Sequence, residues 1–148
     1  MLMDYLGKER NIEQEKFLTQ KYGFDSQVTN FVCYGTKSTD VLGIGERAGV
    51  IYSFKEAFNR FPETEDDWND VIRISTNQVP IQRNLSAENR ACETGASDNS
   101  SIMAIAYGLR PIVRDLEKEK QGLKEFVKIY TRVPSSTFYW NILRSISY

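Results

Sequence analysis

An internal repeat constrains the fold of this chain more than any other feature. The stretch from Glu46 to Ser75 is echoed from Glu119 to Tyr148, where several spaced landmark residues recur in the same order. The matched landmarks, 72 positions apart (132 minus 60, for instance), are Arg60-x-Pro62 with Arg132-x-Pro134, Trp68-Asn69 with Trp140-Asn141, and Phe54 and Phe58 with Phe126 and Tyr130. Repetition at a fixed period indicates that one unit of structure occurs twice.

The similarity extends toward the N-terminus. At a spacing of 73, Val32-Cys33-Tyr34-Gly35 aligns with Ile105-Ala106-Tyr107-Gly108, and Asn11 and Glu15 align with Asn84 and Glu88. We therefore predict a tandem duplication of a unit of about 73 residues, with residues 1–78 as the first unit and residues 79–148 as the second. The two units pack either as one domain or as two.

Each unit reads as four helical segments. In the first unit they begin near Lys8, Asp25, Gly45 and Thr64. The third segment has apolar residues at the spacing of one buried helical face, namely Val50, Ile51, Phe54, Ala57 and Phe58. No stretch alternates with a period of two, so we expect no sheet. The predicted fold class is all-α, with about eight short helices in orthogonal or bundle-like packing.

Capping residues and prolines delimit these helices. Asp25 and Asp98 are suited to N-caps, Thr64 with Asp67 resembles a capping box, and Pro62 prevents continuation of the preceding helix. The predicted structural core consists of Phe54, Phe58, Pro62, Trp68, Phe126, Tyr130, Pro134 and Trp140. Platforms for stacking sugars are the alternative role of the two tryptophans.

Two stretches resemble a known module. They are Gly45-Glu46-Arg47-Ala48-Gly49-Val50, continued through Pro62 and Trp68, and Ala106-Tyr107-Gly108-Leu109-Arg110-Pro111. They are similar to an uncharacterised helical repeat module of secreted or surface-anchored proteins from small-genome, candidate-phylum bacteria, where it tends to occur beside other extracellular modules. The resemblance covers about Asp40 to Tyr148. It implies a helical surface module with a structural or binding role, and it transfers no catalytic residue.

The location of the protein has two alternatives. No run of about 18 apolar residues exists, so we expect no membrane span. The first residues, Met1-Leu2-Met3-Asp4-Tyr5, lack the basic and apolar regions of a signal peptide. We expect an extracellular or cell-surface location if a leader has been removed, and a cytoplasmic one otherwise.

Metal and cofactor sites are not indicated. The chain has no histidine, and its two cysteines, Cys33 and Cys92, do not form a CxxC pair. Cys33 aligns with Ala106, which favours a small apolar side chain at that position over a catalytic thiol. The cysteines either form a disulfide, in an oxidising compartment, or remain free thiols.

Two glutamates are the candidate catalytic residues. Without histidine, general acid–base chemistry depends on carboxylates, Lys, Tyr or Cys. Glu46 and Glu119 occupy equivalent positions and could act as a symmetric pair. The alternative is that each lies in the first turn of a helix, where the helix dipole favours negative charge.

A group of basic residues in the second unit is a candidate ligand-binding face for phosphate or anionic glycans. It consists of Arg110, Arg114, Lys120, Lys124 and Lys128. Acidic residues interleave with it, which is typical of a solvated helix face, and the net charge of the whole chain is −1. We therefore expect no binding to nucleic acid.

The two halves of the chain have opposite charge. Residues 1–75 carry nine basic and thirteen acidic side chains (−4), whereas residues 76–148 carry ten basic and seven acidic ones (+3). Opposite charges on the two units predict weak head-to-tail self-association at low salt.

The function that the sequence favours is a non-catalytic helical repeat module for surface adhesion, scaffolding or cell-wall-associated interaction. Its partners would be a protein or a cell-wall glycan, and no cofactor is expected. One alternative is a small helical hydrolase that acts on cell-wall glycan through Glu46 or Glu119. The other is a cytosolic adaptor.

Overall fold

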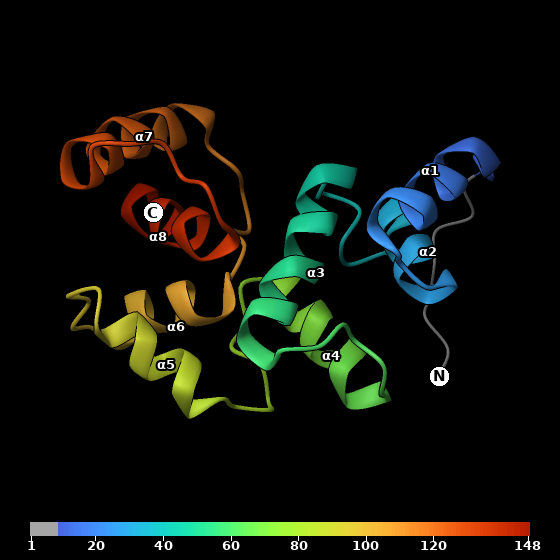
Figure 1. Ribbon diagram of the computed structural model, residues 1–148, viewed down its shortest axis with the longest axis horizontal. Helices are drawn as coiled ribbons and strands as arrows, with labels where there is room; N and C mark the ends of the chain where they lie inside the picture. Colours follow the sequence, from blue (N-terminus) through green and yellow to red (C-terminus); the bar gives the residue numbers. More distant parts are fainter. Residues whose placement is uncertain (1–8) are drawn as a thin grey trace.

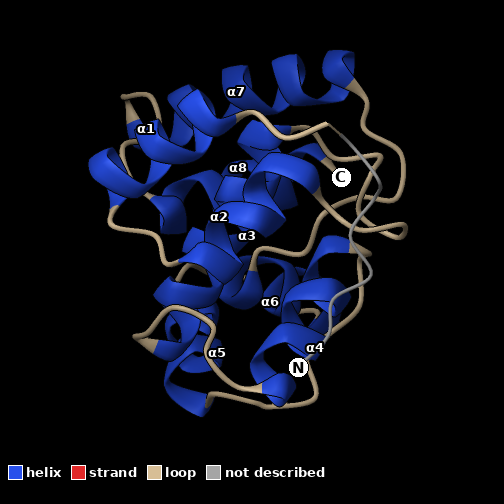
Figure 2. Ribbon diagram, turned by 90° about the vertical axis from the view of Figure 1, so that its right-hand side faces the viewer, coloured by secondary structure: helices blue, strands red, loops and turns tan. Residues whose placement is uncertain are grey.

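The computed structural model describes residues 9–148, and within them the chain is all-helical (Figures 1 and 2). The predicted fold class is confirmed. The eight helices are α1 (Ile12–Tyr22), α2 (Ser26–Tyr34), α3 (Ile44–Phe58), α4 (Glu65–Ser75), α5 (Leu85–Cys92), α6 (Asn99–Tyr107), α7 (Leu116–Tyr130) and α8 (Thr137–Ser147). No strand occurs among residues 9–148.

Predicted N-caps begin several of these helices. Asp25 accepts a hydrogen bond from the amide of Val28 at 2.8 Å, and Asp98 accepts one from the amide of Ser101 at 2.9 Å. Thr64 and Asp67 form a reciprocal capping box at the start of α4. Each cap provides an acceptor for an N–H group that has no partner within its own helix.

The helices form four hairpins of consecutive partners, and α3 lies between the others. The hairpins are α1–α2, α3–α4, α5–α6 and α7–α8. In Figure 1, α3 lies between α1–α2 on one side and α5–α8 on the other. It also contacts α2, α5, α6 and α8. The aromatic rings of Phe58 and Tyr107, from different halves of the chain, stack with their centres 5.9 Å apart. The two halves therefore share one hydrophobic core.

The connection between α4 and α5 is fixed to α4. The buried carboxylate of Asp70 accepts hydrogen bonds from the amides of Ile81 (2.6 Å) and Gln82 (3.1 Å). Further along the chain, the amide of Arg110 donates to the carbonyl of Ile74 at 3.0 Å. Two backbone segments of the second half are thus anchored to the last helix of the first half.

Most of the predicted core is buried, but Trp140 is not. Phe54, Pro62, Trp68, Phe126 and Pro134 are buried. Phe58 and Tyr130 are half-buried and pack against the core. The prediction for Trp140 is wrong, because its side chain is 48% exposed.

Local partners explain why the two tryptophans differ. Trp68 packs against Phe31, with ring centres 5.7 Å apart, and donates its indole N–H to Gln27 at 3.1 Å. The residues 73 positions further along are Ala104 and Ser100, which offer neither an aromatic ring nor an amide. Helix α8 instead buries a different set of residues, Phe138, Asn141, Ile142 and Leu143.

Candidate functional site

A cluster of polar residues recurs at three of the four hairpins, and we call it the tyrosine clamp. Each clamp has an arginine, an Asn or Asp as helix N-cap, a glutamate four residues after the cap, and a tyrosine at or just after the end of the next helix. The three clamps are Arg10, Asn11, Glu15 and Tyr34; Arg83, Asn84, Glu88 and Tyr107; and Arg114, Asp115, Glu119 and Tyr148.

The geometry of the clamp is the same in all three places. The N-cap amide donates to the tyrosine hydroxyl at 2.8 Å each time. The tyrosine hydroxyl donates to the glutamate. The arginine forms an ion pair with that glutamate at 2.8, 2.7 and 2.9 Å, in chain order. The clamp therefore joins the start of the first helix of a hairpin to the end of its second helix.

These contacts change the pKa values of the clamp residues. Hydrogen bonds from arginine lower the pKa of Glu15 and that of Glu88. Burial acts to raise the pKa of Glu119, but hydrogen bonds from Arg114 and Tyr148 outweigh it, so that this pKa is also lowered. Burial, reinforced by Glu88, raises the pKa of Tyr107 to about 12. At neutral pH each clamp thus holds an ionised carboxylate beside a neutral tyrosine.

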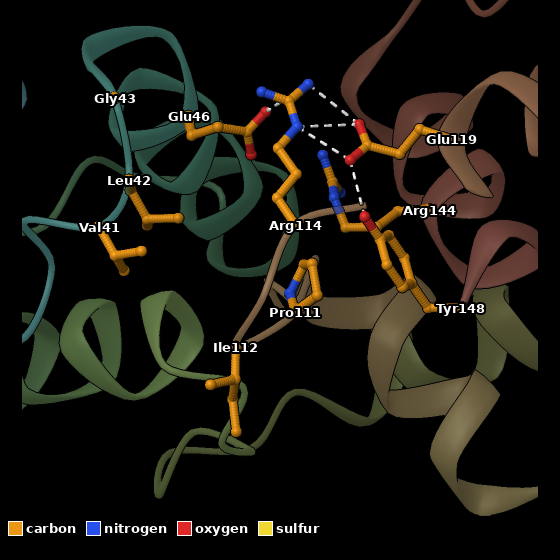
Figure 3. A pocket seen from close by; sticks show the side chains of 10 residues that line it. All are labelled: Val41, Leu42, Gly43, Glu46, Pro111, Ile112, Arg114, Glu119, Arg144 and Tyr148. Atoms are coloured by element: carbon orange, nitrogen blue, oxygen red, sulfur yellow. Dashed lines mark hydrogen bonds and ion pairs between the residues drawn. The ribbon is translucent and has the colours of Figure 1, made fainter. Parts of the chain in front are cut away.

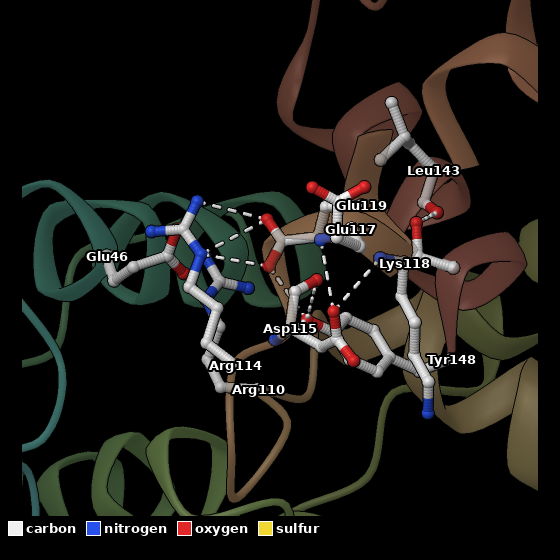
Figure 4. A network of polar contacts seen from close by, with 10 residues as sticks. Glu46, Arg110, Arg114, Asp115, Glu117, Lys118, Glu119, Leu143 and Tyr148 are labelled. Atoms are coloured by element: carbon white, nitrogen blue, oxygen red, sulfur yellow. Dashed lines mark hydrogen bonds and ion pairs between the residues drawn. The ribbon is translucent and has the colours of Figure 1, made fainter. Parts of the chain in front are cut away.

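The hairpin α3–α4 has no clamp. Gly43 is its N-cap and offers no side-chain acceptor, and Thr76 stands 72 positions before Tyr148. Glu46, in the first turn of α3, pairs instead with residues of the α6–α7 connection. Its carboxylate lies 3.0 Å from Nε of Arg110 and 3.8 Å from Arg114 (Figure 4).

The two candidate catalytic glutamates therefore lie in one polar network. Arg114 is ion-paired with both Glu46 and Glu119. Figure 3 shows the cavity that these residues line, at the junction of α3, the α6–α7 connection and the end of α8. Its volume is ≈ 70 Å³, and its other walls are Val41, Leu42, Gly43, Pro111, Ile112, Arg144 and Tyr148. Each glutamate in it has an arginine partner.

A larger cavity adjoins the first. It has a volume of ≈ 440 Å³ and shares Pro111, Ile112, Arg144 and Tyr148 with the small one. The rest of its lining comes from Asn77, Asp98, Ser100, Ser101, Ala104, Leu109 and Ser145. Arg144 thus lies at the boundary of two cavities.

The predicted basic face is smaller than expected. Lys120, Lys124 and Lys128 are exposed on α7. The prediction for Arg110 is wrong, because its side chain is buried and donates to the carbonyl of Gly108 at 2.6 Å in addition to pairing with Glu46. Burial lowers the pKa of Arg110. Arg114 also points into the network with Glu46 and Glu119 rather than along the lysine face (Figure 4).

The cysteines are both free thiols, with Cys33 buried and Cys92 exposed. No group of three or more His, Cys, Asp or Glu side chains suited to hold a metal ion occurs in the described range 9–148. Within the same range, no helix has the length and apolar character needed to cross a membrane.

Sequence reasoning found Glu46 and Glu119 but missed the clamps and Arg144. A signal for the clamps was present, since Arg-Asx-(Ile/Leu)-x-x-Glu occurs at residues 10–15, 83–88 and 114–119. Arg144 has no such signal, because Ile72 is its counterpart in the first unit.

Comparison with protein-family models, with curated proteins and with solved structures found no match to this chain.

Proposed function

We propose that this protein is a non-catalytic helical module that serves adhesion or scaffolding at a cell surface through binding to a cell-wall glycan or a protein. The observation that carries the proposal is the threefold recurrence of the tyrosine clamp. Glu119 has an arginine and a tyrosine as partners in the same arrangement as Glu15 and Glu88, at two sites where no catalytic role was indicated. This recurrence supports a structural role for Glu119.

Glu46 supports the same proposal. Its ion pairs with Arg110 and Arg114 link α3, in the first half of the chain, to the α6–α7 connection in the second half. These ion pairs thus hold the two halves together. The pairing of Glu46 with two arginines supports a structural role for this carboxylate over the hydrolase alternative.

Isolated bacterial cell walls test the proposal. The protein is incubated with them, and co-sedimentation and release of reducing ends are measured in the same sample. We expect the protein to sediment with the walls and no reducing ends above the blank. Release of reducing ends that Glu46→Gln or Glu119→Gln abolishes would show a hydrolase instead. Absence of binding would contradict the wall-associated function.

The cytosolic adaptor is a second candidate, favoured by one observation. Cys92 is an exposed free thiol, which is less common in secreted proteins than in cytosolic ones. Thiol titration of protein purified without reductant separates the two. Two reactive thiols per denatured chain favour the adaptor, and oxidised cysteines favour the surface module.

A further inference from the structure

Arg144 is a cation whose hydrogen-bonding capacity is mostly unused. Its Nη1 atom donates to Oδ1 of Asn141 at 3.0 Å. Among residues 9–148 it has no other hydrogen-bond acceptor and no carboxylate within 4.0 Å. A guanidinium group has five N–H donors in a fixed fork, and Arg144 lines both cavities.

The surrounding charges do not balance. Three arginines meet here (Arg110, Arg114 and Arg144), but only two glutamates, Glu46 and Glu119, lie among them. Arg110 and Arg114 are ion-paired with those glutamates, whereas Arg144 interacts with them only at longer range. Burial lowers the pKa of Arg144, as expected for a cation withdrawn from water without a direct counter-ion. Among residues 9–148, Arg144 therefore lacks a carboxylate that pairs with it directly.

The larger cavity beside Arg144 indicates which kind of ligand would supply a carboxylate for this arginine. Its volume of ≈ 440 Å³ falls in the range of ordinary ligand pockets, about 300 to 1,000 Å³. Hydroxyl groups of Ser100, Ser101 and Ser145 line it, while Leu109, Pro111 and Ile112 provide an apolar wall. Such a combination suits a ring that has hydroxyl groups on its edge and C–H groups on its face.

Asp98 restricts the charge of the ligand. Asp98 lines the same cavity, and hydrogen bonds from Ser101 lower the pKa of its carboxyl group, so that it stays ionised at neutral pH. A second negative charge repels a phosphate dianion but accepts hydrogen bonds from sugar hydroxyls. A singly charged carboxylate is therefore favoured over phosphate.

We propose that the cavity beside Arg144 binds a uronic acid residue of an acidic saccharide. The carboxylate would pair with the guanidinium of Arg144 in the two-bond geometry that arginine favours. The hydroxyls would contact the serines and Asp98, and the ring face would lie on Ile112 and Pro111. This inference rests on the proposed binding function and names the ligand class for it.

Calorimetric titration with oligoglucuronate tests the proposal, with a neutral glucose oligomer of the same length, acetate and inorganic phosphate as separate ligands. We expect oligoglucuronate to bind and the other three to bind at least about tenfold more weakly. Arg144→Gln should weaken binding of oligoglucuronate at least about tenfold. Lys16→Gln, which removes an exposed cation from α1, should leave the affinity unchanged.

Several outcomes would overturn the proposal. They are no binding of oligoglucuronate, equal binding of acetate or phosphate, or unchanged affinity in Arg144→Gln with a native circular dichroism spectrum. If Arg144→Gln does not fold, the comparison between oligoglucuronate and the neutral glucose oligomer on the wild-type protein tests the proposal. Equal affinity for the two oligomers would rule out a carboxylate site. Binding to cell walls without binding to oligoglucuronate refutes this inference but leaves the proposed function standing, whereas loss of both refutes both.

Discussion

At the scale of single residues, two glycines show how closely the helices approach. A Cβ atom on Gly49 would lie 2.5 Å from Nη2 of Arg110, and one on Gly122, the equivalent residue, would collide with Oγ of Ser147. Gly49 therefore makes room for the α6–α7 connection of the other half, and Gly122 makes room for α8 of its own half. At this position the chain needs the absence of a side chain, rather than a freer backbone.

Asp67 is the buried carboxylate with the most partners among the described residues. It accepts hydrogen bonds from Arg60, from Gln82 and from the amides of Glu63 and Thr64. Burial acts to raise its pKa, but these bonds outweigh burial and hold the pKa well below its ordinary value. Asp67 thus stabilises the fold only in its ionised form.

We expect Asp67→Asn to lower the free energy of unfolding at pH 7 by about 1 to 3 kcal/mol. Because the folded pKa is depressed, the contribution is complete above the unfolded pKa of about 3.9 and falls as the pH drops below it. Urea unfolding from pH 7 to pH 3 should therefore show the difference between wild type and variant shrinking below about pH 4. A difference that is constant over that range would contradict this role.

At the scale of helices, the clamps are the common device that closes a hairpin. The three tyrosines differ in burial, since Tyr107 is fully buried, Tyr34 is half-buried and Tyr148 is 45% exposed. Removal of the tyrosine hydroxyl deprives the N-cap amide and the glutamate carboxylate of one hydrogen-bond partner each. The loss of stability caused by such an unpaired group rises with its burial.

The tyrosine-to-phenylalanine series should follow that order. We expect Tyr107→Phe to reduce the free energy of unfolding by about 1 to 3 kcal/mol, Tyr34→Phe by less, and Tyr148→Phe by at most about 0.5 kcal/mol. Chemical denaturation of the three variants measures the series. Equal effects, or a largest effect at Tyr148, would show that the clamps do not act as the contacts indicate.

The tryptophans show what the sequence could and could not predict about the elements. Helix limits were predictable, because caps such as Asp25 and Thr64 act on amides within three residues of themselves. The burial of Trp140 was not predictable, because it depends on whether a residue of another helix packs against the indole. Ala104 and Ser100 stand where the first half has Phe31 and Gln27, and they offer no such partner. Likewise, the ion pair of Arg110 with Glu46 joins residues far apart in the chain, and no local pattern records it.

Substitution of each tryptophan tests this difference. Trp68→Ala should cost about 3 to 5 kcal/mol of stability, whereas Trp140→Ala should cost less than about 1 kcal/mol. The variant Trp140→Phe retains only the buried indole of Trp68, whereas Trp68→Phe retains only the exposed indole of Trp140. Acrylamide should therefore quench the fluorescence of Trp140→Phe much less than that of Trp68→Phe. Similar quenching of the two variants would contradict the exposed position of Trp140.

At the scale of the whole molecule, opposite charges of the two halves meet within one chain. Glu46 pairs with Arg110 and Arg114, and Glu56 pairs with Arg90 at 2.6 Å. All these pairs connect α3 with the second half. They reduce the charge available for the self-association proposed from the sequence, but the acidic residues of α4, Glu65 and Asp66, remain exposed, as do the lysines of α7.

Sedimentation velocity at two ionic strengths tests the proposed self-association. We expect a concentration-dependent increase in sedimentation coefficient at about 0.02 M salt and a monomer at about 0.5 M salt, since salt screens interactions between exposed charges. Lys124→Glu, which reverses one exposed charge of α7, should reduce the association. A monomer under both conditions would refute it.

We propose that the carboxylates of the Glu46–Glu119 cavity are structural and not catalytic. Carbon-13 NMR titration of the Glu119 carboxyl group tests it most directly. The account predicts a midpoint below the ordinary glutamate value of about 4.3, moving upward in Arg114→Gln. A midpoint raised toward about 6, as in carboxylates that act as general acids, would contradict it.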